Sequence, residues 1–470
     1  MTSPTQQSQP ATDATPGAPR LTRALRGKDY FTLAFGSMVG VGWMLVIDDW
    51  LTRGGSVGAM LGFLIGGLIL FPIGYCYGKL TERMPDAGSE VAYTAAVFPR
   101  PISYATGWAM LLAYLIVCPY EAVAVGRIAD YAISATGSSP MDTLKLYTVG
   151  GYPVYLPHLL AGLVLTAVIV TVNYKGIRIS ATFQNITTFG LLAIFAVFAT
   201  LGLIRGTPGN LNPPFADRAG TAGGLISTLL VLQIVPYFMT GFEAAPKCSE
   251  EAASDFNPRY FSRMIYLALA AGISFYVVVI GVVSMVQPWQ SLTKESFATA
   301  VAFERALRSP LISQLIMFGV LLSLLKIFNG NFLTSTRLLY AMGRRGLLET
   351  GLARIHPQHH TPWLAVVFVG VVTAAASLLG RAALIPISEV GSLACAIGWT
   401  ATSLSFCRGA AGPQPLRSRI IGLVGVMIGV ALILMKVLPW IPGSFGRYEY
   451  ISFAGWAVLG CILWLRRPRA

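Results

Sequence analysis

The 470-residue sequence contains little charge, since Asp, Glu, Lys and Arg make up 11% of it, against about 25% in an ordinary soluble domain. It has only six cysteines and four histidines. The cysteines show no paired spacing, which argues against a disulfide framework. Three histidines lie in the segment IHPQHHTPW without a cysteine or carboxylate to complete a ligand set, so we expect a solvated loop and no metal.

Motifs for enzymatic chemistry are also missing. The sequence contains no HExxH, no GxSxG, no phosphate-binding loop and no grouping of histidines with carboxylates. It also contains no soluble nucleotide-binding domain. We therefore expect a protein that is neither an enzyme nor an ATP-driven pump, and that needs no cofactor.

Apolar residues are abundant, at 54% of the chain. A bilayer core requires about 20 apolar residues per helix, because a helix satisfies every backbone hydrogen bond internally. The sequence therefore predicts an all-α integral membrane protein with about twelve transmembrane helices, at residues 31–52, 57–78, 103–133, 155–175, 180–204, 223–248, 260–286, 311–342, 363–380, 384–407, 419–438 and 448–465. Residues 1–20 have no apolar run and are expected to form a disordered cytoplasmic tail.

The net charge of +14 is distributed unevenly across the predicted spans. If the N-terminus is cytoplasmic, 22 Lys and Arg residues fall in cytoplasmic segments and nine in outer ones, of which three lie in the loop 287–310. This asymmetry follows the positive-inside rule and predicts a multi-pass protein of the inner cell membrane with both termini in the cytoplasm. The positive charge thus orients the chain in lipid, and we expect no nucleic-acid partner.

Two of the predicted spans are interrupted. The first contains GSMVGVGWMLVIDDW, residues 36–50, and the sixth contains IVPYFMTGFEAAPKCSEE, residues 234–251, with an ionisable Glu243 in an apolar segment. Glycines alone are also explained by close packing of helices through small residues. Two broken helices in corresponding places, however, favour a transporter of inverted five-helix repeats whose site lies between the breaks. Exposed N–H groups there bind an anionic group and exposed carbonyls bind a cation, so an amino acid fits.

The sequence also resembles the amino acid–polyamine–organocation (APC) superfamily. The resemblance rests on the segments GSMVGVGW, FMTGFEAAPKCSEEAASDFNPRYFSRMI, MPDAGSEVAYTAAVFPRPISYATGW, VNYKGIRIS, STRLLYAMGRRGLLE, HTPWLAV and VGSLACAIGW. It implies one transporter domain over residues 21–470, with discontinuous helices 1 and 6. Two inverted repeats, about 28–206 and 220–408, would be followed by two peripheral helices at about 417–466.

The resemblance also implies a substrate site. It assigns a carboxylate to the backbone N–H groups of Gly40, Val41 and Gly42. It assigns the amine to carbonyls near Met38, Met239 and Thr240, places Tyr237 as an aromatic lid, and gives Glu243 a structural or proton-linked role. The adjoining Gly241 and Phe242 of the sixth-helix motif complete the expected substrate-binding set.

Four ionisable residues depart from the family pattern and are candidates for gating or coupling. Asp48 and Asp49 either end a helix beside Arg53 or form an acidic vestibule for cationic substrates. Glu121 lies mid-span and needs a partner, for which Arg127 is one candidate. Lys326, if it lies beside the first break, replaces a bound sodium ion. Otherwise it pairs with Glu121 or Glu243, or reaches an interface.

These features together predict a secondary active transporter of amino acids or related amines that works by alternating access. A coupling proton or sodium ion and membrane lipid are its other expected partners. Two alternatives stay open: a polyamine or organic amine transporter without carboxylate recognition, and a non-transporting nutrient sensor on the same scaffold.

Overall fold

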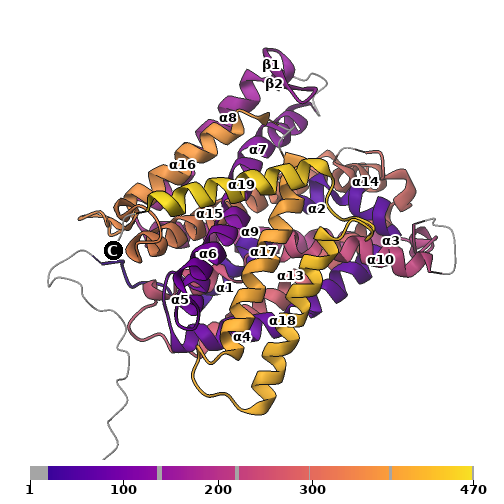
Figure 1. The fold of residues 1–470 in the computed structure, drawn as a ribbon. Helices are drawn as coiled ribbons and strands as arrows, with labels where there is room; N and C mark the ends of the chain where they lie inside the picture. Colours follow the sequence, from indigo (N-terminus) through magenta and orange to yellow (C-terminus); the bar gives the residue numbers. More distant parts are fainter. Residues whose placement is uncertain (1–19, 135–139, 217–221, 296, 381–383, 468–470) are drawn as a thin grey trace, which may run out of the picture.

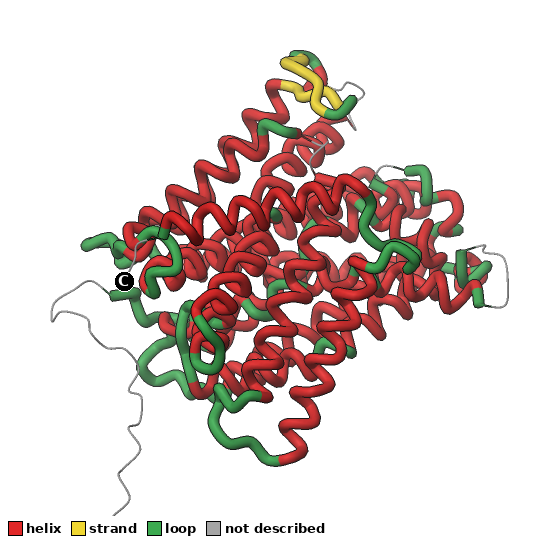
Figure 2. The backbone as a smooth tube through the Cα atoms, in the orientation of Figure 1, coloured by secondary structure: helices red, strands yellow, loops and turns green. Residues whose placement is uncertain are grey.

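The computed structural model describes residues 20–467 apart from 135–139, 217–221, 296 and 381–383 (Figure 1). The expected disordered tail therefore lies, except for Arg20, outside the described residues. Figure 2 shows that helices make up most of the described chain and that the two strands lie together at one tip.

The first half of the chain contains nine α-helices and one hairpin. The helices are α1 (Gly27–Met38), α2 (Gly42–Leu45), α3 (Ile47–Leu68), α4 (Phe71–Arg83), α5 (Glu90–Ala95), α6 (Arg100–Leu115), α7 (Val117–Ser134), α8 (Leu156–Tyr174) and α9 (Ile177–Arg205). A 3₁₀ turn η1 (Pro140–Asp142) and antiparallel strands β1 (Lys145–Val149) and β2 (Tyr152–Tyr155) connect α7 to α8.

The second half begins with a helix in three pieces. These are α10 (Gly223–Leu232), α11 (Val235–Met239) and α12 (Ala244–Lys247), followed by the turn η3 (Ser249–Glu251). The remaining helices are α13 (Tyr260–Val286), α14 (Ala298–Leu307), α15 (Pro310–Arg344), α16 (Trp363–Ser377), α17 (Leu384–Cys407), α18 (Leu416–Val437) and α19 (Arg447–Arg466).

The all-α, multi-pass membrane fold is confirmed. Within the described ranges, nine helical segments are long and apolar enough to cross a bilayer, and two further apolar helices, α10 and α16, are shorter. All twelve expected spans coincide with helical segments, and α17 has the expected bounds. The boundary between the first two spans lies inside α3, at Gly55, whose φ of 69° turns the chain.

The last two helices lie on the outside of the bundle: in Figure 1, α19 crosses the front of the molecule and α18 runs along its lower part. Large apolar side chains on both are exposed, including Leu423, Met427, Val458 and Leu465. Apolar side chains gain nothing from facing water, so these faces fit contact with lipid tails. The inverted relation between the two five-helix repeats remains a prediction.

Candidate functional site

The first helix is interrupted directly after Met38. α1 ends there, Val39 is extended (φ −93°, ψ 101°), and the helix resumes with α2 at Gly42. An interruption releases backbone groups that a continuous helix would pair internally. The carbonyl of Met38 accepts a hydrogen bond from the Tyr276 hydroxyl at 3.2 Å, whereas the carbonyls of Val39 and Gly40 face α15.

The sixth helix is interrupted between α11 and α12, and its break touches the first one. Thr240 is extended (φ −64°, ψ 137°) and Gly241 has a φ of +130°. A Cβ atom on Gly241 would lie 2.5 Å from the carbonyl carbon of Ser37, so only glycine fits this close approach of two backbones. The break depends on glycine both for its conformation and for its space.

Glu243 supports the break of the sixth helix. Its Oε2 accepts a hydrogen bond from the Gly241 backbone N–H at 3.0 Å, and its Oε1 accepts one from Trp399 Nε1 at 3.4 Å. The side chain is fully buried. Glu243 therefore satisfies a backbone donor that the interrupted helix leaves without an intrahelical acceptor.

A small cavity of about 20 Å³ lies between the two breaks. It has room for about one water molecule, since a site needs roughly 10–15 Å³ to hold one. Six of the nine expected substrate residues line it: Met38, Gly40, Val41, Gly42, Tyr237 and Thr240.

Three expected substrate residues lie outside the cavity wall. Gly241 packs on the backbone of the first helix, as described above. Met239 is buried and its side chain approaches Gly272 of α13. Phe242 points toward Tyr77 and Trp399, with ring centroids 5.6 and 5.5 Å away. Alternate residues of the interrupted segment thus face different neighbours.

Several residues of the cavity wall were missed from the sequence. They are Ser37, Val117, Tyr120, Phe238, Ile327 and Asn331. Asn331 could have been identified from the sequence, because an amide side chain in an apolar span needs hydrogen-bond partners and is therefore a candidate for a functional position. Its Nδ2 donates to the carbonyls of Ser37 at 3.1 Å and Ile327 at 2.9 Å. Phe238 could not have been identified in this way, because an aromatic residue in an apolar span most often belongs to the hydrophobic core.

Lys326 lies beside the first break, which was the condition for its sodium-replacing role. Its Nζ donates to the carbonyl of Val39 and, at 3.4 Å, to that of Gly36, and it lies 5.3 Å from the Phe35 ring. Ser323, one turn earlier on α15, donates to the Gly40 carbonyl at 2.7 Å. The fully buried amino group of Lys326 thus occupies backbone carbonyls that the interrupted helix exposes.

Glu121 lines the same cavity and interacts electrostatically with Lys326. Its side chain is buried, and within the described chain its Oε2 has no hydrogen-bond partner. Arg127, the alternative partner, lies over the Phe297 ring at 5.6 Å and interacts with Asp48. Lys326 is thus the cation that interacts with the buried acid.

The two adjacent aspartates lie in the first turn of α3, and Asp49 forms an ion pair there. Asp49 binds Arg53 at 2.7 Å, and Arg53 also lies 3.6 Å from Glu389 of α17. Glu389 in turn pairs with Lys436 of α18. The pairing of this helix end with Arg53 agrees with the first of the two readings for Asp49.

A buried ion pair lies on the other side of the cavity, toward the end of α12. Lys247 Nζ donates to Glu90 Oε1 at 2.6 Å and to the Tyr114 hydroxyl at 2.8 Å, and Tyr77 donates to the same Glu90 oxygen at 2.7 Å. All four side chains are fully buried. The pair joins the sixth helix to the segment that precedes the third.

Two further groups of ion pairs join η3 to the end of α15. Arg337 binds Glu251 through two bonds of 3.0 and 2.6 Å, fully buried. Nearer the surface, Arg344 lies 2.5 Å from Glu250 and 3.1 Å from Asp86.

Asp86 also binds Arg345 at 2.8 Å. Burial alone would raise the pKa of the Asp86 carboxyl, but the guanidinium groups of Arg345 and Arg344 outweigh it and hold the pKa below its ordinary value. The carboxylate is therefore ionised at neutral pH. Asp86 thus takes part in this network as a charge.

The sequence was compared with known protein families, and the amino acid permease model matches residues 25–464. The chain belongs to the amino acid permease family. This confirms the resemblance to the APC superfamily, whose motifs extend over nearly the same range.

Curated relatives of this permease are distant. The methylthioribose transporter of Bacillus subtilis is 24% identical over 96% of this chain and 94% of its own length. The mouse cationic amino acid transporter 4 is 28% identical over 83% of this chain, which covers 60% of that longer protein. The branched-chain amino acid permease BcaP of Bacillus subtilis is 24% identical over 81% of this chain and 78% of its own length. These relatives are named for three different kinds of substrate.

Proposed function

We propose that this permease is a secondary active transporter that carries an amino acid or a related amine across the cytoplasmic membrane by alternating access. The observation that carries the proposal is the cavity between the two helix breaks, with polar groups from four helices around it. Membership of the amino acid permease family supports the substrate class. The charge asymmetry supports an orientation with both termini in the cytoplasm.

The two ends of an amino acid would find different partners in this cavity. The backbone N–H groups at Gly40, Val41 and Gly42 provide donors for a carboxylate at the start of α2. Carbonyls at Met38 and Thr240, together with the Glu121 carboxylate, provide acceptors for an ammonium group. Tyr237 and Phe238 supply the apolar wall.

An amine without a carboxylate is the second candidate substrate. Glu121 favours it, because a buried carboxylate in the cavity wall attracts a cation and one of its oxygens has no hydrogen-bond partner in the described chain. The substrate names of the relatives support neither candidate over the other, since they differ among themselves.

Lys326 supports coupling to protons, or transport without an ion, over coupling to sodium. Sodium would bind backbone carbonyls at the first break, and the Lys326 ammonium already donates to those of Val39 and Gly36. A cation that is covalently part of the protein can leave only by losing a proton. In the proposed cycle, Lys326 holds the break closed when charged and releases it when neutral.

The small volume of the cavity supports a cycle in which the site opens to one side at a time. The ion pairs of Lys247 and of Arg337 would separate whenever the first and sixth helices move away from the third and eighth on the cytoplasmic side. The movement itself is part of the proposal. The described conformation is the one in which these pairs are formed.

Uptake into proteoliposomes tests the proposal. Purified permease would be offered labelled amino acids, decarboxylated amines and polyamines, with proton and sodium gradients imposed separately. We expect accumulation of at least one substrate under a proton gradient or without any gradient, and none that requires sodium. Binding without uptake would instead support the sensor alternative, and a strict sodium requirement would refute the role of Lys326.

A further inference from the structure

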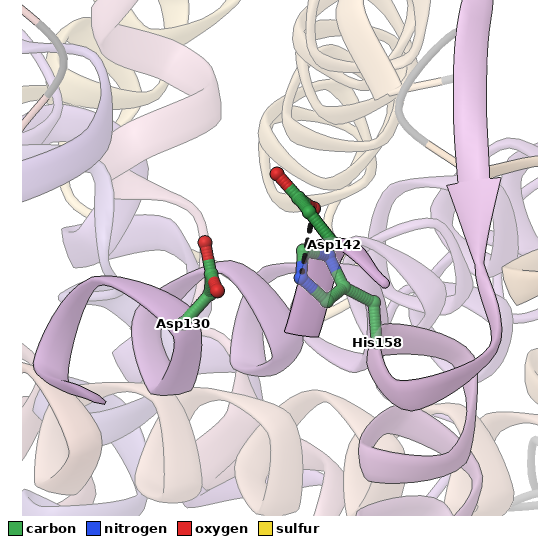
Figure 3. A group of neighbouring side chains, drawn as sticks. All are labelled: Asp130, Asp142 and His158. Atoms are coloured by element: carbon green, nitrogen blue, oxygen red, sulfur yellow. Dashed lines mark ion pairs between the residues drawn. The ribbon is translucent and has the colours of Figure 1, made fainter. Parts of the chain in front are cut away.

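A histidine and two aspartates meet at the outer end of the molecule, outside the cavity of the helix breaks. Asp130 comes from α7, Asp142 from η1 and His158 from the first turn of α8 (Figure 3). One ligand atom from each lies within 4.8 Å of the others. From the sequence we found no grouping of histidines with carboxylates, because these three residues lie 12 and 16 positions apart in the chain. The fold corrects that expectation by bringing them together.

His158 points into this cluster with a buried and unused nitrogen. Its Nε2 lies 3.6 Å from Asp142 Oδ1, which is longer than a hydrogen bond, and has no hydrogen-bond partner in the described chain. The imidazole rests against the Tyr155 ring, with centroids 5.8 Å apart. A buried polar atom without a partner is costly, so it calls for a ligand.

The spacing suits a transition-metal ion. Zinc binds histidine nitrogen and carboxylate oxygen at about 2.0–2.2 Å, which places neighbouring ligand atoms of a tetrahedron about 3.4 Å apart. His158 and Asp142 are already near that separation. The Asp130 carboxylate would need to approach the other two ligand atoms by up to about 1.4 Å, from 4.8 to 3.4 Å. Asp142 can adjust its position as well, because its side chain is 46% exposed.

The donor set also selects the class of ion. One imidazole with two carboxylates offers two negative charges to a divalent cation, and the imidazole favours zinc over calcium or magnesium, which prefer oxygen ligands. The cluster borders a cavity of about 410 Å³, which leaves room for water as the remaining ligand. The same cavity reaches Ala122, the neighbour of Glu121 in the central site.

We propose that Asp130, Asp142 and His158 form a binding site for a divalent transition metal, with zinc as the best fit, at the outer ends of α7 and α8. The ion fastens the third helix to the fourth helix and to the 3₁₀ turn η1 between them. It thereby fixes one wall of the cavity that leads toward the central site. The proposal does not depend on what the permease transports.

Isothermal titration of purified, full-length permease without a histidine tag, using zinc chloride, tests this site. We expect one zinc ion per chain, and magnesium chloride to give no binding at equal concentration. Asp142→Asn, which changes an exposed side chain, and His158→Ala should each weaken zinc binding at least tenfold while size-exclusion profiles stay unchanged.

A matched control comes from two histidines that lie close together elsewhere in the described chain. His356 and His359 lie 4.7 Å apart at their centroids, without a carboxylate in the cluster. His359→Ala should leave zinc binding unchanged. Loss of binding in His359→Ala but not in Asp142→Asn would overturn the proposal. Absence of binding to the unmodified protein would overturn it equally, leaving His158 and Asp142 as a simple ion pair.

Discussion

At the scale of single residues, the glycines of the two breaks differ in what a side chain at their position would contact. A Cβ atom on Gly241 would collide with backbone atoms at 2.5 Å, which cannot move without displacing a helix. A Cβ atom on Gly42 would lie 2.6 Å from Cε1 of Phe238, a side chain in the cavity wall. Substitution at Gly241 should therefore destabilise the fold, whereas substitution at Gly42 should reduce the space available to a ligand.

Gly42→Leu should abolish substrate binding and leave the protein folded. The new side chain would fill the space between the first break and Phe238, so we expect affinity to fall at least a hundredfold. Equilibrium binding of the labelled substrate measures this. Gly455→Leu is the control, since nothing lies within 4 Å of a Cβ atom at that position on α19. Equal affinities of the Gly42 variant and the unmodified permease would remove the first break from the site.

Lys326→Met should destabilise the protein and change the pH dependence of uptake. The substitution leaves Glu121 buried without its cation and removes the Lys326 hydrogen bond to the Val39 carbonyl, which keeps only the 3.3 Å bond from Ser323. We expect a loss of about 3 kcal/mol in the free energy of unfolding. We expect the double variant Lys326→Met/Glu121→Gln to recover part of that loss. Thermal unfolding in detergent and uptake between pH 5 and pH 8 measure the two effects.

A second buried lysine, Lys436, provides the control for the Lys326 variant. Lys436 is 2% exposed and paired with Glu389, and it lies far in sequence from both breaks. Lys436→Met should also lower the melting temperature, yet leave the pH profile of uptake unchanged. If both variants behave alike, Lys326 is a structural charge and has no part in coupling.

At the scale of helices and strands, local signals were sufficient for most of the chain. Apolar runs of about 20 residues gave spans such as 155–175 and 384–407, because each helix in lipid satisfies its own backbone. Glycines indicated both interrupted helices, because glycine has a low helix propensity and a break in a membrane helix leaves backbone groups without internal partners. The first interruption is shorter than the glycines suggested, since Gly36 still belongs to α1 and only residues 39–41 leave the helix.

Contacts between distant segments could not be obtained in that way. Glu90 is the first residue of the short helix α5, yet it is fully buried against Lys247, which lies 157 residues later. Nothing local in either segment predicts the other partner. The positions of Tyr120 and Asn331 in the cavity wall were equally unpredictable. The neighbours of a helix set its orientation about its own axis, and therefore which of its side chains face the cavity.

The buried pair of Glu90 and Lys247 should show strong coupling. We expect Glu90→Gln and Lys247→Met each to lower the free energy of unfolding by about 3–5 kcal/mol, since each leaves an uncompensated charge or polar group inside the protein. The double variant should lose clearly less than the sum. Unfolding of the four proteins in a double-mutant cycle gives the coupling energy.

The exposed pair of Lys79 and Glu82 serves as the comparison for that cycle. These side chains lie 2.9 Å apart but are 37% and 18% exposed. Solvent screens such a pair, so its coupling energy should stay below about 1 kcal/mol. Additive effects at Glu90 and Lys247 would mean that the two groups do not stabilise each other, contrary to their geometry.

At the scale of the whole molecule, the charged contacts on the side of α12 and η3 join elements that the transport cycle would separate. The first helix is also tied to this region, because the N–H groups of Ala24 and Leu25 donate to the Glu251 carbonyl at 2.8 and 2.9 Å. Glu251 in turn binds Arg337 of α15. One residue thus connects the start of the first helix, the end of the sixth and the eighth.

Asp86→Asn should favour opening on this side of the molecule. Its partners Arg344 and Arg345 are partly exposed, so we expect a cost to the closed conformation of at most about 1 kcal/mol and an opening equilibrium raised about two- to fivefold. Cys248 reports the change, because it is fully buried in the described conformation. Its labelling by a membrane-impermeant thiol reagent, followed by mass spectrometry, should accelerate by the same factor.

The sign of the pH dependence gives the same prediction a second readout. Because the folded protein lowers the pKa of Asp86, its contribution is complete above the ordinary carboxyl pKa and is lost only as the pH falls through the lowered value. Between pH 6 and 8 the ratio of labelling rates, variant to unmodified permease, should therefore stay constant. Glu295→Gln breaks an ion pair with Arg305 in the loop on the opposite side and should leave Cys248 labelling unchanged. Faster labelling in that variant as well would show that Cys248 becomes exposed by general loosening of the fold, and the ion pairs of Asp86 would then have no specific part in closing the permease.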